Sequence, residues 1–126
     1  FPGMFTVKRL SDGRFTTTGK SIPGRQINLG PTALLTIGGI DIVVASRRMQ
    51  AFDQDIFKHI EVEPAEQKIL VLKSTCHFRA DFEPIAEQVL IAVAPGAHVV
   101  DSTTYPFQYL RDGVRLAPMG PAFSGG

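Results

Sequence analysis

Alternating apolar and polar positions near the start of the chain predict two β-strands joined by a tight turn. Residues 5–10 alternate, the pair Asp12-Gly13 is typical of turns, and residues 15–18 are aromatic and β-branched. We therefore expect a hairpin over residues 5–18. The next stretch, residues 19–31, is rich in glycine and proline, which favours a surface loop without regular structure.

The clearest pattern in the sequence surrounds a Gly38-Gly39 pair. Both flanking segments, residues 32–37 and 40–46, are rich in β-branched side chains, and two glycines can adopt the positive φ angles of a two-residue turn. A second hairpin follows from this pattern. Apolar residues on both faces of these strands indicate a sheet that is covered on both sides over part of its length.

The middle of the chain carries apolar residues at helical spacing. Asp53 is a good N-cap for a short helix that ends before Pro64, and a second helical turn is expected over residues 64–67. The apolar face of the first helix is formed by Phe52, Ile56, Phe57 and Ile60. Short helices packed on a sheet are the expected result.

Two apolar runs, residues 68–73 and 88–93, are typical of strands buried on both faces. Ser74 or Thr75 can cap a helix between them, with Phe78, Phe82 and Ile85 at spacings of four and three. The two runs and the helix predict one strand–helix–strand unit with a right-handed crossover. From residue 97 onward the chain reads as an extended arm that packs through its aromatic residues.

These elements define the expected fold class. We expect an α/β fold, with α+β as the alternative, built on a mixed β-sheet with two hairpins and one strand–helix–strand unit. The length of 126 residues and the 44% hydrophobic content suit a single domain over residues 1–126. Strand order stays open.

Charge and cysteine content narrow the function classes only slightly. Lys plus Arg total 13 against 12 for Asp plus Glu, so the formal charge of +1 gives no overall attraction to nucleic acid or a membrane surface. No apolar stretch approaches the roughly 20 residues of a membrane helix. The single cysteine, Cys76, lacks a recognisable base partner and is expected to be a buried, inert thiol. A cytoplasmic protein is the default expectation.

Two polar segments follow apolar strands, where binding sites in α/β folds usually lie. Lys73 and Ser74 next to a helix N-terminus would suit an anion, and Arg47 or Arg48 would add a bidentate grip on a carboxylate. The candidate substrate- or anion-binding residues are Ser46, Arg47, Arg48, Gln50, Lys73, Ser74 and Arg79. His77 is the candidate catalytic residue. Each of these residues also has an ordinary structural interpretation, and the meeting of the two segments is an assumption.

No metal site is expected from this chain itself. His59, His77 and His98 lack ligand-type spacing, and neither His-Glu-x-x-His nor Cys-x-x-Cys occurs. The Gly38-Gly39 pair lacks the lysine and the spacing of a phosphate loop. No cofactor is therefore expected in this part of the protein.

Several segments occur in the order found in one known family. Ser11-Asp12-Gly13-Arg14-Phe15, residues 29–33, the Gly38-Gly39 hairpin, residues 46–53, and Lys73-Ser74 with His77-Phe78-Arg79 resemble the C-terminal domain of MlrC (microcystinase C-like) metallopeptidases. The likeness extends from about Met4 to about Leu116. It departs after Phe107, where the family tends toward a more basic end.

The resemblance implies a piece of a longer protein whose preceding N-terminal domain holds zinc and the hydrolytic centre. This chain would then be the substrate-facing, structural part of a zinc-dependent peptidase or amide hydrolase, inactive alone. Its partners would be that domain and a peptide or amide substrate, and a homo-oligomer stays open. Two alternatives remain: a module that only assembles domains or subunits, and, with less support, a domain that binds phosphate-containing ligands.

Overall fold

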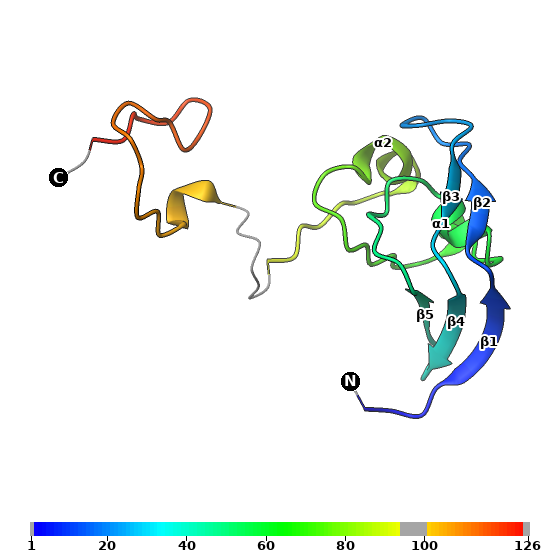
Figure 1. Ribbon diagram of the computed structural model, residues 1–126. Coiled ribbons are helices and arrows are strands. Elements are labelled where there is room, and N and C mark those ends of the chain that lie inside the picture. The colour runs from blue at the N-terminus through cyan, green and yellow to red at the C-terminus, as the bar shows by residue number, and fades with distance from the viewer. Residues whose placement is uncertain (1, 94–100, 125–126) are drawn as a thin grey trace. The chain divides into compact units, whose positions relative to one another are not determined.

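The computed structural model describes residues 2–93 and 101–124, which belong to two compact units, Phe1–Val89 and Leu90–Gly126. The first unit contains all the strands: β1 (Thr6–Ser11), β2 (Arg14–Thr16), β3 (Gln26–Asn28), β4 (Thr32–Ile37) and β5 (Ile40–Ala45). Its helical elements are α1 (Asp55–Lys58), η1 (Pro64–Glu66), α2 (Arg79–Phe82) and η2 (Glu83–Ile85). Antiparallel sheets and short helices make it an α+β arrangement, the second of the two expected classes (Figure 1).

The second expected hairpin is confirmed. β4 and β5 pair antiparallel from Thr32↔Ala45 to Ile37↔Ile40, and Gly38 and Gly39 hold φ angles of 53° and 81° in the turn. Side chains other than glycine avoid such angles, so the glycine pair fixes both the turn and the register.

The first expected hairpin is wrong in its pairing, although both of its strands form. β1 pairs with β4, giving a three-stranded sheet in the order β1-β4-β5, while β2 pairs with β3 in a separate two-stranded sheet. The Oγ of Ser11 accepts a hydrogen bond from the backbone N–H of Gly13, and the Oδ1 of Asp12 accepts one from the N–H of Arg14. These bonds form a corner in the chain. This corner directs the chain from one sheet to the other. β3 also lies in the stretch expected to lack regular structure.

The expected strand–helix–strand unit is not formed in the described residues. Neither residues 68–73 nor residues 88–93 join a sheet, and their apolar side chains are exposed, with Ile69 at 84% and Leu90 at 79%. A strand forms its hydrogen bonds with a neighbouring strand, and in the described residues neither run pairs with one. Both runs remain extended.

The core of the first unit lies where α1 packs on the small sheet. Ile27, Leu29, Phe52 and Ile56 form one buried cluster, with Phe15 and Phe57 against it. Ile60 is fully buried, which confirms the expected apolar face, although α1 itself has only four residues and follows Gln54 rather than the expected cap Asp53. η1 confirms the helical turn at Pro64. α2 begins at Arg79 without a side-chain cap, so the expected caps at Ser74 and Thr75 are wrong, although Phe78 and Phe82 are buried.

The described part of the unit Leu90–Gly126 contains turns, one short helix and a single β-bridge. η3 (Ser102–Thr104) is capped by Asp101, whose carboxylate accepts hydrogen bonds from the N–H and Oγ1 of Thr103 at 2.9 and 2.6 Å. Arg115 and Ala122 form a single β-bridge, and the rings of Tyr105 and Phe107 lie 5.0 Å apart. The arm expected from residue 97 therefore folds on itself, and His98 lies outside the described residues. A single domain over residues 1–126 stays a prediction.

Candidate functional site

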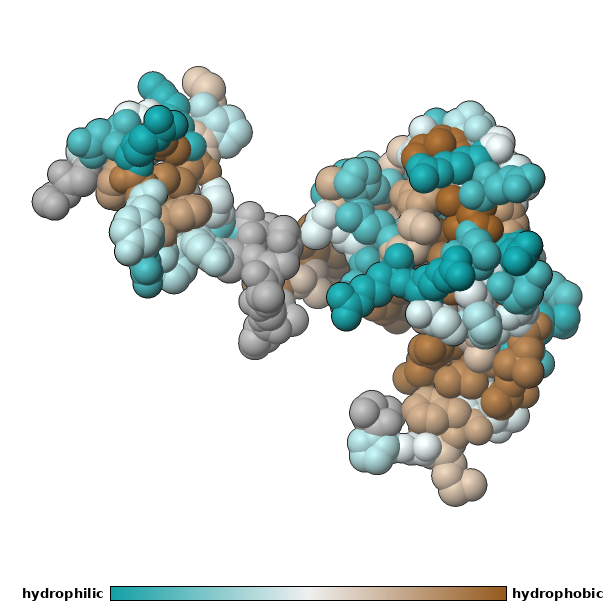
Figure 2. Space-filling model, in the orientation of Figure 1, coloured by the Kyte–Doolittle hydropathy of each residue, from teal (hydrophilic) through white to brown (hydrophobic). Residues whose placement is uncertain are grey.

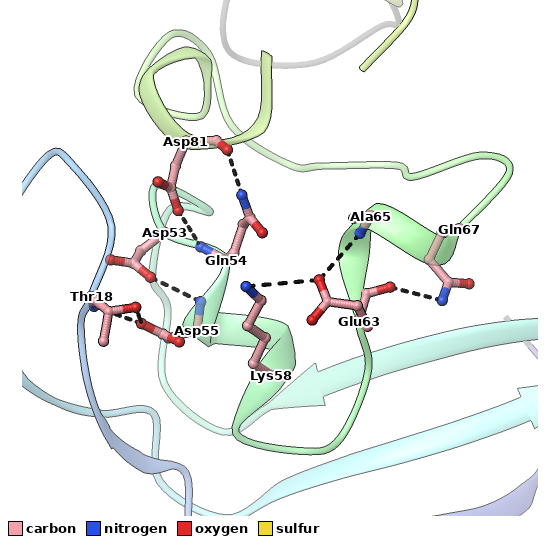
Figure 3. A network of polar contacts seen from close by, with 9 residues as sticks. All are labelled: Thr18, Asp53, Gln54, Asp55, Lys58, Glu63, Ala65, Gln67 and Asp81. Carbon is pink, nitrogen blue, oxygen red and sulfur yellow. Dashed lines mark hydrogen bonds and ion pairs between the residues drawn. The ribbon is translucent and has the colours of Figure 1, made fainter. Parts of the chain in front are cut away.

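Buried carboxylates tie the two polar segments of the chain together. Figure 3 shows Asp81 of α2 facing the start of α1, where its Oδ2 accepts a hydrogen bond from the backbone N–H of Gln54 at 2.7 Å. The Nε2 of Gln54 returns a 2.7 Å bond to the carbonyl oxygen of Asp81. Asp81 is 9% exposed, so these bonds form in a partly dry environment where they are stronger than at the surface. They fix the start of α1 against α2.

The same carboxylates hold the glycine-rich loop that follows β2. Asp53, 1% exposed, accepts hydrogen bonds from Gly19 N–H at 3.0 Å and Asp55 N–H at 2.8 Å, and Asp55 accepts two from Thr18. A Cβ atom at residue 19 would lie 2.6 Å from an oxygen of Asp81, closer than real atoms approach. Only glycine fits, so residue 19 is selected by the close packing of backbone and carboxylate.

Burial raises the pKa of Asp53 above its ordinary value, although its two backbone N–H donors oppose the shift. The neighbouring Asp55 carboxylate adds to the rise. N–H dipoles, rather than a cationic side chain, offset part of the cost of burying this charge. We call this cluster of Asp53, Asp55 and Asp81 the carboxylate clamp. Further negative charge beside it would raise the free-energy cost of burying the Asp53 carboxylate.

The clamp brings the two polar segments into contact at Gln50 and His77. The Nδ1 of His77 lies 2.6 Å from the Oε1 of Gln50. Because an amide oxygen only accepts, Nδ1 carries the proton and Nε2 keeps the lone pair in the neutral ring. The imidazole is thus oriented and can act through Nε2 as a base or as a hydrogen-bond acceptor.

Cys76 lies beside this pair and is exposed, so the expectation of a buried thiol is wrong. Its Sγ is 3.6 Å from the Nδ1 of His77 and 3.9 Å from the Oγ1 of Thr75. The segment before α2 is an open turn, which explains the exposure. Gln50, Cys76 and His77 together form a polar corner that is open to solvent, called the Gln50–His77 corner below.

The candidates after β5 divide into anchored and unanchored side chains. The Oγ of Ser46 donates to the carbonyl oxygen of Pro31 at 2.6 Å, and Arg47 N–H donates to the carbonyl oxygen of Leu29 at 2.9 Å. These bonds secure the segment. Within residues 2–93 and 101–124, the guanidinium groups of Arg47 and Arg48 form no ion pair or hydrogen bond, so both are available to a ligand.

The candidates before α2 divide in the same way. Arg79 pairs with Glu83 at 2.8 Å and lies 5.3 Å from the ring centroid of Phe78. In the described chain Lys73 makes no ion pair, and the Oγ of Ser74 is buried without a hydrogen-bond partner. Because α2 begins at Arg79 and has four residues, the helix dipole expected to attract an anion at Ser74 is not there. Among the described residues, Arg47, Arg48 and Lys73 are the cations of the two segments that make no ion pair.

Comparison with known proteins identifies the family of this chain. The model of the MlrC C-terminus matches residues 1–109. The chain belongs to the MlrC C-terminal family. Microcystinase C from Sphingomonas sp. is 28% identical over 71 residues, which cover 56% of this chain and 14% of that protein. The crystal structure titled "Putative metallopeptidase" from Mesorhizobium sp. BNC1 is similar, with a TM-score of 0.59, 27% identity, and coverage of 65% of this chain and 17% of that one.

The coverage shows how small a part of these relatives the MlrC C-terminal chain represents. It spans about a seventh of microcystinase C and about a sixth of the Mesorhizobium protein. In the part of the chain that the structure describes, no group of three or more His, Cys, Asp or Glu side chains is placed to hold a metal ion. Likewise, no described helix of this MlrC chain is long and apolar enough to cross a membrane.

Sequence reasoning did not single out the carboxylate clamp. Asp81 carried a usable signal, because it lies three residues after Phe78 and one before Phe82, on the buried face of the expected helix. A charged residue at such a position must find polar partners. Its contacts with Gln54 and Lys20, which are distant in sequence, had no signal in this MlrC chain alone.

Proposed function

We propose that this chain is the C-terminal, substrate-facing part of an MlrC-type hydrolase of peptides or amides. Membership of the family and the likeness to a protein described as a metallopeptidase support the hydrolase class. In this proposal the zinc and the hydrolytic centre belong to a domain that precedes this region in the longer polypeptide. In the described residues no group of three or more His, Cys, Asp or Glu side chains is placed to hold a metal ion, and the role proposed for this chain is binding and orientation.

The observation that carries the proposal is the contact of Gln50 with His77. It joins the two polar segments at one exposed corner through two residues that are 27 positions apart in the sequence, and Asp81 and Gln54 make a further contact between neighbouring parts of the chain. Arg48 and Lys73 supply unpaired positive charge on the same two segments. A peptide carboxylate bound by Arg48 would suit the planar, two-pronged geometry of guanidinium. His77 would then hydrogen-bond the substrate through Nε2.

Kinetics of a longer polypeptide that includes the preceding region would test this role. We expect Arg48→Ala to lower kcat/KM by about tenfold or more, which corresponds to about 1.4 kcal/mol of lost transition-state stabilisation. Arg14→Ala is the matched control, because Arg14 is also exposed and its ion pair with Asp12 spans 3.9 Å. Equal kcat/KM for the two variants would contradict a substrate-binding role for Arg48.

A second assay separates binding from catalysis. Metal content and hydrolysis should be measured for residues 1–126 alone and for the longer polypeptide. The proposal expects bound metal and turnover only in the longer polypeptide. Full activity of residues 1–126 would overturn the division of labour between the two parts.

The exposed apolar side chains of β1 and β5 favour a second candidate, a module that assembles domains without touching substrate. Under that alternative, Arg48→Ala and Lys73→Ala both leave kcat/KM within about threefold, under about 0.7 kcal/mol. A third candidate, a phosphate-ligand binding domain, predicts a rise in Tm with phosphorylated ligands.

A further inference from the structure

One face of the β1-β4-β5 sheet consists entirely of apolar side chains. In the observed register, alternate residues of β4 and β5 share a face with their cross-strand partners. This apolar sheet face is formed by Val7, Leu10, Ala33, Leu35, Ile37, Ile40, Ile42 and Val44. Figure 2 shows hydrophobic residues gathered over this sheet. No charged residue interrupts the face.

A β-bulge in β1 keeps the charges on the opposite face. Val7 pairs with Leu35 and Arg9 with Leu34, so Lys8 is an extra residue in the strand. In a bulge two neighbouring residues oppose one partner residue, which lets Lys8 and Arg9 lie on the same side. There Lys8 pairs with Asp41 at 2.8 Å, and Arg9 pairs with Glu61. Residues that follow α1 line a hollow together with this charged face, and Leu34 on the same face is buried.

The apolar sheet face itself is exposed in the described structure. Leu10 is 74% exposed, Ile40 63%, Val7 56% and Val44 47%. Scattered apolar residues are ordinary on protein surfaces, but a contiguous apolar patch marks a contact with another body. An uncharged face also excludes an acidic or basic partner, because such a partner would lose water from its charges without gaining ion pairs.

The position of the N-terminus indicates what covers the face. A Cβ at Gly3 would lie 3.3 Å from the ring of Phe5 and 3.4 Å from the Cδ1 of Ile37, so the chain enters β1 beside the end of the apolar sheet face. Residues that precede this region in a longer polypeptide would start at that edge. The matched relatives have more than four-fifths of their length outside the aligned region, with 14% and 17% covered.

We infer that the apolar sheet face is the docking surface for the preceding, larger part of an MlrC-type polypeptide. This inference rests on the proposed function, which supplies that preceding part, and it assigns the residues through which the two parts meet. The docked element presents an uncharged, apolar surface to β1, β4 and β5. The Gln50–His77 corner uses none of the residues of this face.

Side-chain oxidation by hydroxyl radicals tests the inference directly. Leu10, Ile40 and Val44 should be oxidised readily in residues 1–126, and at least about fivefold less in the longer polypeptide, where docking excludes water from them. Equal oxidation in both would overturn the inference. If these side chains are already protected from oxidation in residues 1–126, the inference is also overturned. The face would then be covered by the chain itself, or by a second copy if protection grows with protein concentration.

A matched pair of variants separates docking from folding. Val44→Lys places a charge on the apolar sheet face, whereas Thr6→Lys places one on the opposite face, where Thr6 is exposed. In the longer polypeptide Val44→Lys should restore the oxidation of Ile40 and Leu10, and Thr6→Lys should not. In residues 1–126 the two variants should keep similar Tm values. Restored oxidation with both variants, or with neither, would overturn the inference.

Activity distinguishes this inference from the proposed function. A protected face in a longer polypeptide without hydrolase activity would overturn the proposed function and support the docking surface. Full hydrolase activity of a longer polypeptide whose apolar sheet face is still oxidised would support the proposed function and overturn the docking surface. Both measurements, oxidation and hydrolase activity, are made on unsubstituted proteins, so neither depends on whether a variant folds.

Discussion

The β4–β5 hairpin and the apolar runs of residues 68–73 and 88–93 have similar compositions but different structures. The hairpin pairs along its whole length, whereas neither run joins a sheet in the described chain. β4 finds its partner two residues away, because the turn at Gly38-Gly39 brings β5 alongside. A run such as 68–73 has no neighbour in sequence and depends on a strand from elsewhere.

This difference separates two meanings of an apolar sequence. In β4 the apolar residues are followed by a tight turn, which determines that β5 is the partner strand. Composition and pairing therefore agree. In residues 68–73 composition indicates burial, yet Ile69 and Val71 are 84% and 86% exposed. An apolar run therefore predicts a buried strand only where the chain also supplies a neighbouring strand to pair with.

Amide hydrogen exchange should show the largest difference between the two regions. We expect amides in the middle of β4, such as Leu35, to exchange at least about a thousandfold more slowly than Val71, because only the former are held in a ladder that opens with the fold. Exchange followed by mass spectrometry on residues 1–126 measures this. Comparable protection of Val71 would show that the run already pairs within the chain.

Matched leucine truncations should show the next largest effect. Leu34→Ala removes a side chain that is 6% exposed and should cost about 2–5 kcal/mol of unfolding free energy. Leu90→Ala, at 79% exposure, should cost less than about 0.5 kcal/mol. Urea unfolding of both variants gives the comparison, and a large cost at Leu90 would contradict the exposed state of the second run.

How far the sequence predicts this chain depends on the distance between interacting residues. The Gly38-Gly39 turn, the buried face of α1 and the turn at Pro64 follow from residues within one element, and all three were predictable. The pairing of β1 with β4 was not, because nothing local distinguishes β4 from β2 as the partner. The Asp12-Gly13 sequence is typical of a hairpin turn, yet the strands on either side of it, β1 and β2, belong to different sheets.

The candidate site shows the same division. Polar segments at residues 46–53 and 73–79 were visible in the sequence, and Gln50 and His77 do meet. The helix dipole expected at Ser74 was not found, because α2 begins at Arg79. The clamp of Asp53 and Asp81 joins residues far apart in the chain, so a single sequence carries little sign of it.

The turn of the hairpin offers a prediction of intermediate size. Gly39→Ala should cost about 1–2 kcal/mol, because a φ of 81° is unfavourable for a residue with a Cβ. Gly39→Asn should lose less, since asparagine tolerates the left-handed region. Thermal unfolding of the two variants checks the order. Equal Tm values for Ala and Asn would mean that the turn changes conformation when residue 39 is replaced.

The pH dependence of stability should show the smallest effect. Because the pKa of Asp53 is raised in the folded state, its protonation contributes stability as the pH falls from neutrality through that folded pKa toward about 4. Asp53→Asn removes this contribution, so its Tm should gain less or fall more on acidification than that of the unsubstituted chain. Asp41, whose pKa is lowered by the hydrogen bond from Lys8, acts in the opposite direction in both proteins. Parallel Tm curves would contradict the raised pKa.

The bulge at Lys8 has a consequence for how related sequences align. Deleting the extra residue returns β1 to regular pairing, with Val7 and Leu10 still on the apolar sheet face and only one cation lost. Deleting Arg9 in place of Lys8 gives the same alternation, because one cation then still separates Val7 from Leu10. Among relatives, a one-residue gap should therefore fall at residue 8 or 9, and its presence or absence should vary together with the acid at position 41.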